Sequence, residues 1–509
     1  MYGSNTMPLD PPTPDSLPVN EAWQPLPPDQ WREDAAAHLL RRISFSANPA
    51  IVRSILKHPI RRVLSRFYGE TRPLKTSAAC EAFAASLPQA YFELYNTIKD
   101  PKERRQRRQQ LNRENNKFFR EFAMDWYAHA RDEANSAQEK FVLFLHDILV
   151  IDRRKVRDAP TLIDYQHLLR KGIQTTYPQL CKAVSRHPGM LIYLDLKEST
   201  AQKPNENFAR ELFELFVLGE GNYTETDVKE AARAFTGHRL GKRTIYSFNP
   251  RAHDSGLKTI FGQRGRWNGD AVIDLAFQQP AARTFFIREL LKFYLTDGEL
   301  PHEAYIEALG EQWAAHNFQI RYLIFTLFES RLFFHPAYRG NRVKSPTQFY
   351  IGLCQDLNLA IVPFQGRLLQ SMRSMGQDFY NPPNVRGWQY GQHWINSTTI
   401  RARRQVVDYA FSPLYENYLN GNEKKALADA RAANQSNFKI SEDRLKPLLA
   451  QSNAALTQHL CNFFITERFR DTYQTRVSEL IGDTAAKGAL NRTRNTLMAL
   501  LQSPAYNLC

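Results

Sequence analysis

The stretch that decides the fold is Pro204-Asn-Glu-Asn-Phe-Ala-Arg-Glu-Leu-Phe-Glu-Leu-Phe-Val-Leu-Gly219. Asparagine is a good helix N-cap and glycine suits the residue just past a helix end, so Asn205 and Gly219 predict a helix between them. Four polar residues recur on one face of that helix, at i, i+3, i+4 and i+7: Asn207, Arg210, Glu211 and Glu214. All other positions from 208 to 218 are apolar, which predicts an interior helix with a narrow polar stripe.

Charged groups on an interior helix must find partners, because an unpaired buried charge is strongly unfavourable. One interpretation is an internal arginine–glutamate network that fixes helix packing. The other is the wall of a polar cavity, in which Glu206, Arg210, Glu211 and Glu214 act as catalytic groups or cation ligands and Asn207 binds ligand. A pair of glutamates one turn apart is only a weak metal signal, and the residues leave both interpretations open.

Helical patterns continue on both sides of this stretch, and alternating β-type runs are scarce. The exception lies at 238–262, where Thr244–Phe248 and Leu257–Phe261 could pair as a β-ribbon. We therefore predict an all-α, mainly helical protein with a small β excursion near 240–262. The helices are expected at 34–42, 49–57, 118–129, 136–150, 207–218, 226–235, 281–294, 303–317, 319–329 and 346–357.

Three segments define the expected domain organisation. Residues 1–30 hold eight of the 28 prolines, which predicts an extended tail. Residues 31–509 are expected to form a single large helical domain, since no internal repeat of 20–50 residues is present. Within it, the polar segment 414–455 reads as a peripheral insertion or linker.

Composition excludes several classes of protein. With 43% hydrophobic and 23% charged residues, the chain is neither disordered throughout nor a collagen-like fibre. Its five scattered cysteines form no CxxC pair, which argues against a disulfide framework and a cysteine-based zinc site. The absence of a secretory signal and of a long apolar run predicts a cytoplasmic chain without a transmembrane segment.

The formal net charge of +15 favours anionic partners, whether an anionic ligand, nucleic acid or lipid. The densest basic run is Lys102–Arg120, whose arginines at 104, 105, 107 and 108 spread around more than half of a helix. A solvated helix is the favoured interpretation of this run, and phosphate or lipid contact is the alternative. Nucleic-acid binding is disfavoured because no nucleic-acid motif is present.

Familiar catalytic motifs are missing: the sequence has no GxxxxGK[ST], HExxH, GxSxG or GxGxxG signature in the required context. Two histidines are nevertheless candidates for a site. His253, beside Asp254 in the β excursion, could act as an oriented base or ligand, or cap a turn. His146 lies on the apolar segment 141–151, where a core histidine is the commoner outcome and ligand binding the alternative.

A non-helical loop follows at 375–398, where Pro382-Pro383 and Gly387 enforce a structured backbone. Such loops line sites more often than they merely connect elements. We expect Trp394 and Asn396 to face the same way on an extended piece, and Arg386 to pair with a carboxylate of the 207–214 stripe. Its candidate ligand-binding residues are Asn384, Arg386, Trp388, Trp394 and Asn396.

The chain resembles a bacterial family known as domain of unknown function 1800. The resemblance covers nearly all of residues 35–509 and rests on motifs such as His187-Pro-Gly-Met-Leu-Ile-Tyr-Leu-Asp195, the 205–215 stretch, Phe235-Thr-Gly237, Pro382-Pro-Asn-Val-Arg-Gly-Trp388 and Trp394-Ile-Asn-Ser397. It implies a predominantly helical fold, no assigned activity and, frequently, a neighbouring gene for a sulfatase- or phosphatase-like protein. The resemblance also implies export for many members of the family. This chain departs from the family at Ile148 and Phe216, where typical members carry histidine, so a histidine-based metal site would be altered here.

Three functions remain open at this point. The first is a polar ligand-binding or catalytic cavity walled by the 205–214 helix and the 382–398 loop. The second is a non-catalytic scaffold for a co-encoded sulfatase- or phosphatase-like protein, and the third is nucleic-acid binding through the basic surface. The residues specify no cofactor, metal, substrate, reaction or oligomeric state, and they do not decide whether the protein is an enzyme.

Overall fold

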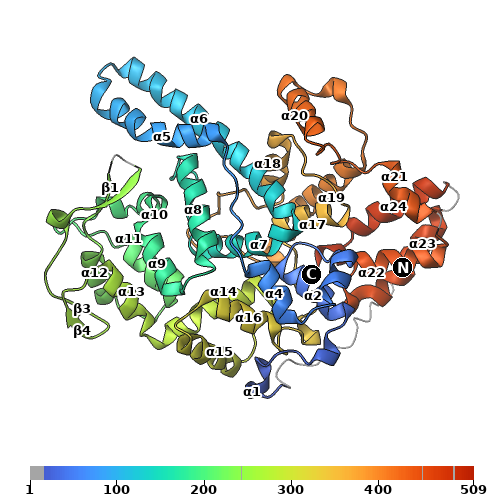
Figure 1. Ribbon diagram of the computed structural model, residues 1–509, viewed down its shortest axis with the longest axis horizontal. Coiled ribbons are helices and arrows are strands. Elements are labelled where there is room, and N and C mark those ends of the chain that lie inside the picture. The colour runs from blue at the N-terminus through green and yellow to red at the C-terminus, as the bar shows by residue number, and fades with distance from the viewer. Residues whose placement is uncertain (1–16, 242–243, 450, 485–487) are drawn as a thin grey trace.

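The computed structural model describes residues 17–241, 244–449, 451–484 and 488–509. In these ranges the chain folds into 24 α-helices and two antiparallel sheets of two strands each (Figure 1). The prediction of a mainly helical protein with a small β excursion is confirmed. No helix in the described ranges is both long and apolar enough to cross a membrane.

Helix α7 (Glu133–Ile148) forms the centre of the fold (Figure 1). Every residue from 135 to 148 except Leu143 is buried. Polar side chains on such a helix must be satisfied inside the protein, as Glu139 is by Arg170 Nε at 2.6 Å. Its neighbours are α2 (Glu33–Ile43), α4 (Ile60–Tyr68), α6 (Pro101–Arg131), α8 (Ala159–Gly172) and α14 (Phe285–Tyr294).

The described part of the proline-rich N-terminal segment is packed against the domain. It contains helix α1 (Val19–Ala22), which contacts α15 (Glu303–Ala315). Trp23 is 6% exposed, and its indole N–H donates to the Tyr305 carbonyl oxygen at 2.7 Å. Residues 17–30 therefore belong to the folded body, whereas the first 16 residues of the expected tail lie outside the described ranges.

The β excursion is present, but the expected strand pairing is wrong. Strand β1 (His238–Gly241) pairs with β2 (Ile245–Phe248), and β3 (Lys258–Ile260) pairs with β4 (Gln263–Gly265). Each strand thus pairs with its nearest neighbour along the chain. The cause is clear in the second hairpin, where Phe261 and Gly262 both have positive φ, the conformation of a tight two-residue turn.

Helices α5 (Ala78–Phe92) and α6 form a hairpin that projects from the body of the molecule (Figure 1). Its inner end is anchored by aromatic packing, with the Phe83 and Phe118 rings 4.9 Å apart. The basic run 102–120 lies on α6 and is helical as expected, and the helix continues into the buried aromatic segment that begins at Phe118.

The remaining helices complete the body and its C-terminal part. Helix α20 (Gly421–Ala432) packs on a small apolar cluster of its own around Phe364 and Leu427, separate from the main core. The other helices are α3 (Pro49–Ile55), α9 (Tyr177–Arg186), α10 (Pro188–Tyr193), α11 (Asn207–Glu211), α12 (Glu225–Ala234), α13 (Gly269–Phe277), α16 (Ile320–Glu329), α17 (Pro346–Asp356), α18 (Gln365–Ser374), α19 (Ser397–Phe411), α20 (Gly421–Ala432), α21 (Glu442–Leu449), α22 (Asn453–Phe464), α23 (Arg470–Thr484) and α24 (Ala489–Leu501).

Candidate functional site

The 204–219 stretch forms a helix whose polar side reaches the surface. Its apolar residues Phe208, Leu212 and Phe216 are buried, but Asn207 is exposed and Arg210, Glu211 and Glu214 are half-buried. The expectation of an interior helix is therefore wrong on its polar side. Apolar residues around much of the circumference reflect deep packing on several neighbours, while the charged groups reach solvent and so avoid full desolvation.

The polar stripe is divided because the helix changes type. Helix α11 continues as a π-helix over Leu212–Val217, in which backbone bonds span five residues, as from Leu218 N to Phe213 O. Arg210 pairs with Glu206 at 3.1 Å and with Glu225 at 2.7 Å, while Glu214 accepts from Tyr223 Oη at 2.8 Å. The polar residues of the stripe therefore form two separate clusters, one around Arg210 and the other around Glu214.

Arg386 joins the 382–398 loop to this helix. Its guanidinium lies 2.6 Å from Glu214 Oε1 and also pairs with Glu220. The predicted contact between Arg386 and a carboxylate of the stripe is therefore confirmed. Hydrogen bonding to Glu220 raises the pKa of Arg386 further, so the arginine is a fixed positive charge. The loop backbone is held locally, with Arg386 N–H donating to Asn384 Oδ1 at 2.8 Å.

Asp147, at the end of the central helix α7, holds the other side of the same loop. Its Oδ1 accepts the Trp388 backbone N–H at 2.7 Å, and its Oδ2 accepts the Tyr390 hydroxyl. Burial raises the pKa of Asp147 to about 7, even though these two hydrogen bonds lower it. Asp147 is therefore a carboxyl group that can change protonation state near neutral pH.

A pocket of about 650 Å³ lies between these elements. Its wall combines the π-helix, the end of α7, helix α14 and the 385–393 segment. Four of its carboxylates are paired: Glu214 and Glu220 with Arg386, Asp297 with Arg342 at 2.9 Å, and Glu289 with Lys292 at 2.7 Å. The ionisable residues that line it are Asp147, Glu214, Glu220, Glu289, Lys292, Asp297, Arg386 and His393.

Two further candidates lie near this pocket without lining it. His146 is 3% exposed, and its Nε2 lies 3.0 Å from the Ile151 carbonyl oxygen. Burial lowers the pKa of His146 to about 4, and its ring packs 4.2 Å from that of Tyr380. His146 thus lies in the core as a neutral side chain. Glu211 is half-buried beside the pocket, and burial together with the nearby Glu214 raises its pKa.

The second half of the loop has a structural role. Trp388 and Trp394 are 7% and 4% exposed, so both anchor the loop in the core. Residues Gly391–Trp394 form a 3₁₀ turn, and the expected extended piece carrying Trp394 and Asn396 on one side is therefore wrong. Asn396 instead caps α19, because its Oδ1 accepts from the Thr398 and Thr399 backbone amides, each at 3.0 Å.

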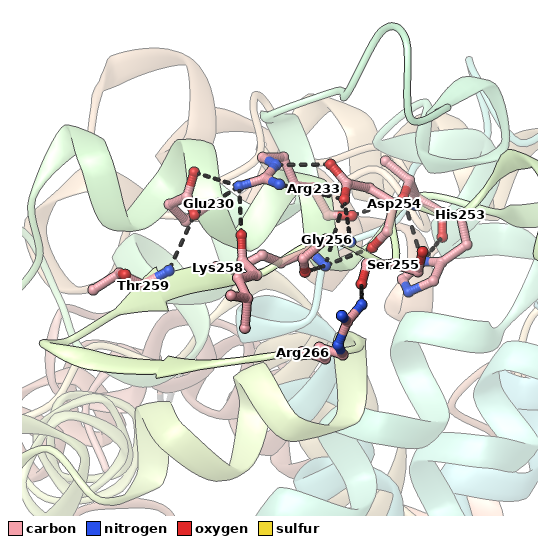
Figure 2. A network of polar contacts seen from close by, with 11 residues as sticks. Glu230, Arg233, His253, Asp254, Ser255, Gly256, Lys258, Thr259 and Arg266 are labelled. Atoms are coloured by element: carbon pink, nitrogen blue, oxygen red, sulfur yellow. Dashed lines mark hydrogen bonds and ion pairs between the residues drawn. The ribbon is translucent and has the colours of Figure 1, made fainter.

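His253 and Asp254 belong to a different network, shown in Figure 2. Asp254 Oδ2 accepts from Arg233 Nε at 2.7 Å, and the same guanidinium pairs with Glu230. His253 Nδ1 lies 3.0 Å from the Thr236 carbonyl oxygen. The hydrogen bond from Arg233 lowers the pKa of Asp254. Neither His253 nor Asp254 lines the pocket, so the structure does not bring all predicted residues together.

The two departures from the family pattern lie in different surroundings. Ile148 lines the pocket next to Asp147. Phe216 is 1% exposed in the core, and its carbonyl oxygen accepts the Tyr177 hydroxyl at 2.7 Å. Among the described residues, no three histidine, cysteine, aspartate or glutamate side chains form a group that could hold a metal ion.

Sequence reasoning missed several residues of the pocket. Asp147 was visible as a charge inside an apolar helix, and Tyr390 lies two positions after Trp388. Nothing in the sequence indicates that Glu289, Lys292 and Asp297 belong to a site. They have the ordinary spacing of polar residues on an amphipathic helix and just after it, and they reach the pocket only because of how α14 packs.

The fold and the pocket together define a class: a mainly helical protein in which a π-helix and a distant loop meet at one polar pocket. The chain belongs to the family described as Protein of unknown function (DUF1800), which matches residues 38–508. The resemblance drawn from the motifs is thereby confirmed. No curated protein and no solved structure matches the chain significantly.

Proposed function

We propose that the pocket between the π-helix and the 385–393 segment binds a small polar molecule, with Asp147 as the group that exchanges a proton with it. The observation that carries this proposal is the convergence of Asp147, Glu214 and Arg386 on one pocket of about 650 Å³. That volume falls within the range of small-molecule sites, which combine apolar walls with a few polar groups.

Asp147 supports a proton-transfer role because burial raises its pKa to about 7. A general acid or base works best when its pKa lies near the working pH. Arg386 supports a positioning role, since Glu214 and Glu220 hold its guanidinium at the pocket wall. A ligand that competes for either carboxylate would meet a preformed, charged binding surface.

The charge of the wall favours a neutral or cationic ligand. Five carboxyl groups line the pocket against two fixed cations, Lys292 and Arg386, with Arg342 lying behind Asp297. This local excess of acid runs against the chain's net charge of +15, from which an anionic ligand was considered. Polyols, amino sugars and quaternary amines are therefore the first classes to test.

The test is a thermal-shift screen with glucose, glucosamine, choline and spermidine as probes. At least one probe is expected to raise Tm of the unmodified chain, and Glu214→Gln and Asp147→Asn are each expected to abolish that rise. The matched control is Glu225→Gln, which removes an exposed partner of Arg210 away from the pocket. The pocket would be refuted as a binding site if a probe stabilised the unmodified chain and all three variants equally, or if no probe stabilised the unmodified chain.

A scaffold for a co-encoded sulfatase- or phosphatase-like protein is the second candidate. It is favoured by candidate residues that already have partners within the chain, such as Arg210 with Glu206 and Asp254 with Arg233. Co-expression and co-purification test it: a stable complex that Glu214→Gln leaves intact would favour the scaffold, and a complex lost in that variant would point back to the pocket.

A further inference from the structure

The hairpin of α5 and α6 projects from the body of the molecule (Figure 1). Exposed aromatic side chains lie at its free end. At the end of α5, Phe92 is 56% exposed, and Tyr95 in the short π-helix that follows (Glu93–Thr97) is 42% exposed. Neighbouring large apolar side chains at a projecting end form a candidate contact surface, because covering them removes unfavourable exposure to water.

The chain's positive charge is concentrated on the same hairpin. Residues 99–120 contain nine lysines and arginines against three acidic residues, a net charge of +6 out of the chain's +15. The acids have local roles: Asp100 caps α6 by accepting from the Lys102 and Glu103 amides at 3.2 and 3.1 Å. Local acids therefore leave much of the basic charge uncompensated.

Four exposed arginines of α6 have no acidic partner among the described residues, whereas Arg107 and Lys117 pair with Glu93 and Glu121. Arg104 bends back to the Ile98 carbonyl oxygen, but Arg105, Arg108, Arg113 and Arg120 are exposed and form no ion pair with the described residues. At the α-helical repeat, positions 102, 105, 113 and 120 fall within about a quarter of the circumference. Helix α6 therefore presents an unpartnered basic face that leads from the aromatic tip.

We propose that the tip of this hairpin docks on an anionic lipid surface, with Phe92 and Tyr95 entering the headgroup region and the basic face binding lipid phosphates. Basic residues beside an anionic membrane each add about 1 kcal/mol of attraction, and aromatic side chains suit the interface between headgroups and acyl chains. Charge complementarity thus selects the partner, and the exposed aromatics select the tip as the contact.

The distribution of aromatics favours lipid over nucleic acid. Binding of single strands relies on aromatic rings interleaved with cations, on which bases stack. Residues 101–117 of α6 contain no aromatic residue, and Phe118 and Phe119, which follow, are buried. The exposed rings of the hairpin, Phe92 and Tyr95, lie at its convex end, where a membrane surface can reach them. A nucleic-acid strand lying along the basic face of α6 would find no exposed ring on which to stack its bases.

Sedimentation with vesicles tests this proposal on the full chain. Vesicles of phosphatidylglycerol and phosphatidylcholine in equal amounts are expected to bind it, and pure phosphatidylcholine vesicles are not. The triple variant Arg105→Gln/Arg113→Gln/Arg120→Gln, which removes three cations of the basic face, should bind roughly a hundredfold more weakly, about fivefold per charge. The variant Phe92→Ala should weaken binding by roughly tenfold.

Two controls make the result specific. The variant Arg62→Gln/Arg401→Gln/Arg404→Gln lowers the net charge equally at exposed sites on α4 and α19, and Tyr418→Ala removes an aromatic side chain that is 81% exposed elsewhere. Both should bind like the unmodified chain. Equal losses in test and control variants, or no binding to anionic vesicles, would overturn the proposal. Binding to a duplex or single-stranded oligonucleotide that depends on the same arginines, without vesicle binding, would replace it with nucleic-acid recognition.

Discussion

Gly387 lies directly against the carboxylate of Asp147. A β-carbon at Gly387 would overlap Asp147 Oδ1 and stand 2.9 Å from Cγ, and the φ angle of +78° is one that other residues rarely adopt. Because there is no side chain at this position, the next residue, Trp388, can donate its backbone N–H to that carboxylate at 2.7 Å. The close approach fixes the loop that carries Arg386.

The first prediction follows from this contact. Gly387→Ala should lower the free energy of unfolding by about 3 kcal/mol, the sum of a strained positive φ and a steric overlap with a packed neighbour. Gly221→Ala is the matched control, because Gly221 also has a positive φ, +81°, but nothing within 4 Å of the added carbon. The free energy of unfolding of that control should fall by only about 1–2 kcal/mol. Urea denaturation of both variants measures the difference, and equal losses would show that the Asp147 contact tolerates a side chain.

The second prediction concerns the protonation of Asp147. Its pKa is about 7 in the folded chain and about 3.9 in an unfolded one. Between these values the folded state keeps a proton that the unfolded state releases, so this group lowers stability as pH rises from about 4 to about 7. Asp147→Asn removes the effect and keeps an acceptor for Trp388 N–H. Its stability relative to the unmodified chain should therefore rise between pH 5 and pH 8, by up to about 3 kcal/mol, because about two pH units of this window lie above pH 5.

Chemical denaturation at pH 5 and pH 8 checks this expectation. A variant that is less stable than the unmodified chain at pH 8 would show that Asp147 is an ionised structural anchor. In that case the proton-transfer role in the proposed function would fail as well.

Helix positions could be predicted from the sequence because the apolar spacing and end signals are local. Thr224 and Asp227, for example, have capping-box spacing and form that box at the start of α12. The Arg386 contact could also be predicted, since two long motifs each carried charged groups that needed partners. The pairing of these two distant segments could be inferred from their charges because Arg386 had few candidate carboxylate partners.

The parts that could not be predicted depend on backbone geometry and packing. The π-helix at 212–217 separates Glu214 from Arg210, and α-helical spacing gives no warning of that change. His253 and Asp254 looked like a catalytic pair, but Arg233 binds the aspartate from a helix that ends many residues earlier. Glu289 and Asp297 joined the pocket only through the packing of α14 against α7.

The third prediction tests the ion pairs at the pocket. Glu214 is 19% exposed and its partner Arg386 is 55% exposed, with Glu220 as a second partner for the arginine. Removing Glu214 therefore strands no buried charge, and Glu214→Ala should lower stability by no more than about 1 kcal/mol. Glu211→Ala should be neutral or stabilising near pH 7, because burial already raises the pKa of Glu211.

Thermal melts with and without a stabilising probe decide this point. A loss of about 3–5 kcal/mol in either variant would identify a structural ion network instead of a binding wall. Unchanged stability together with unchanged probe binding would contradict both interpretations of the stripe.

The last prediction separates the Arg233–Asp254 network from the pocket. Asp254→Asn should lower the free energy of unfolding by about 1–2 kcal/mol at pH 7, since it weakens a charge-assisted hydrogen bond between partly buried groups. Arg233 lowers the folded pKa of Asp254 below its usual 3.8, so the stabilisation is complete above about pH 4 and is lost as pH falls through the folded pKa. The difference between the two proteins should therefore shrink at pH 3, while probe binding at pH 7 stays unchanged because Asp254 does not line the pocket.

Urea denaturation at the two pH values, with Asp443→Asn at an exposed ion pair as the control, measures the effect. A loss of the same size at both pH values would mean that the carboxylate's charge contributes nothing, and a loss of probe binding would place Asp254 in the functional site after all.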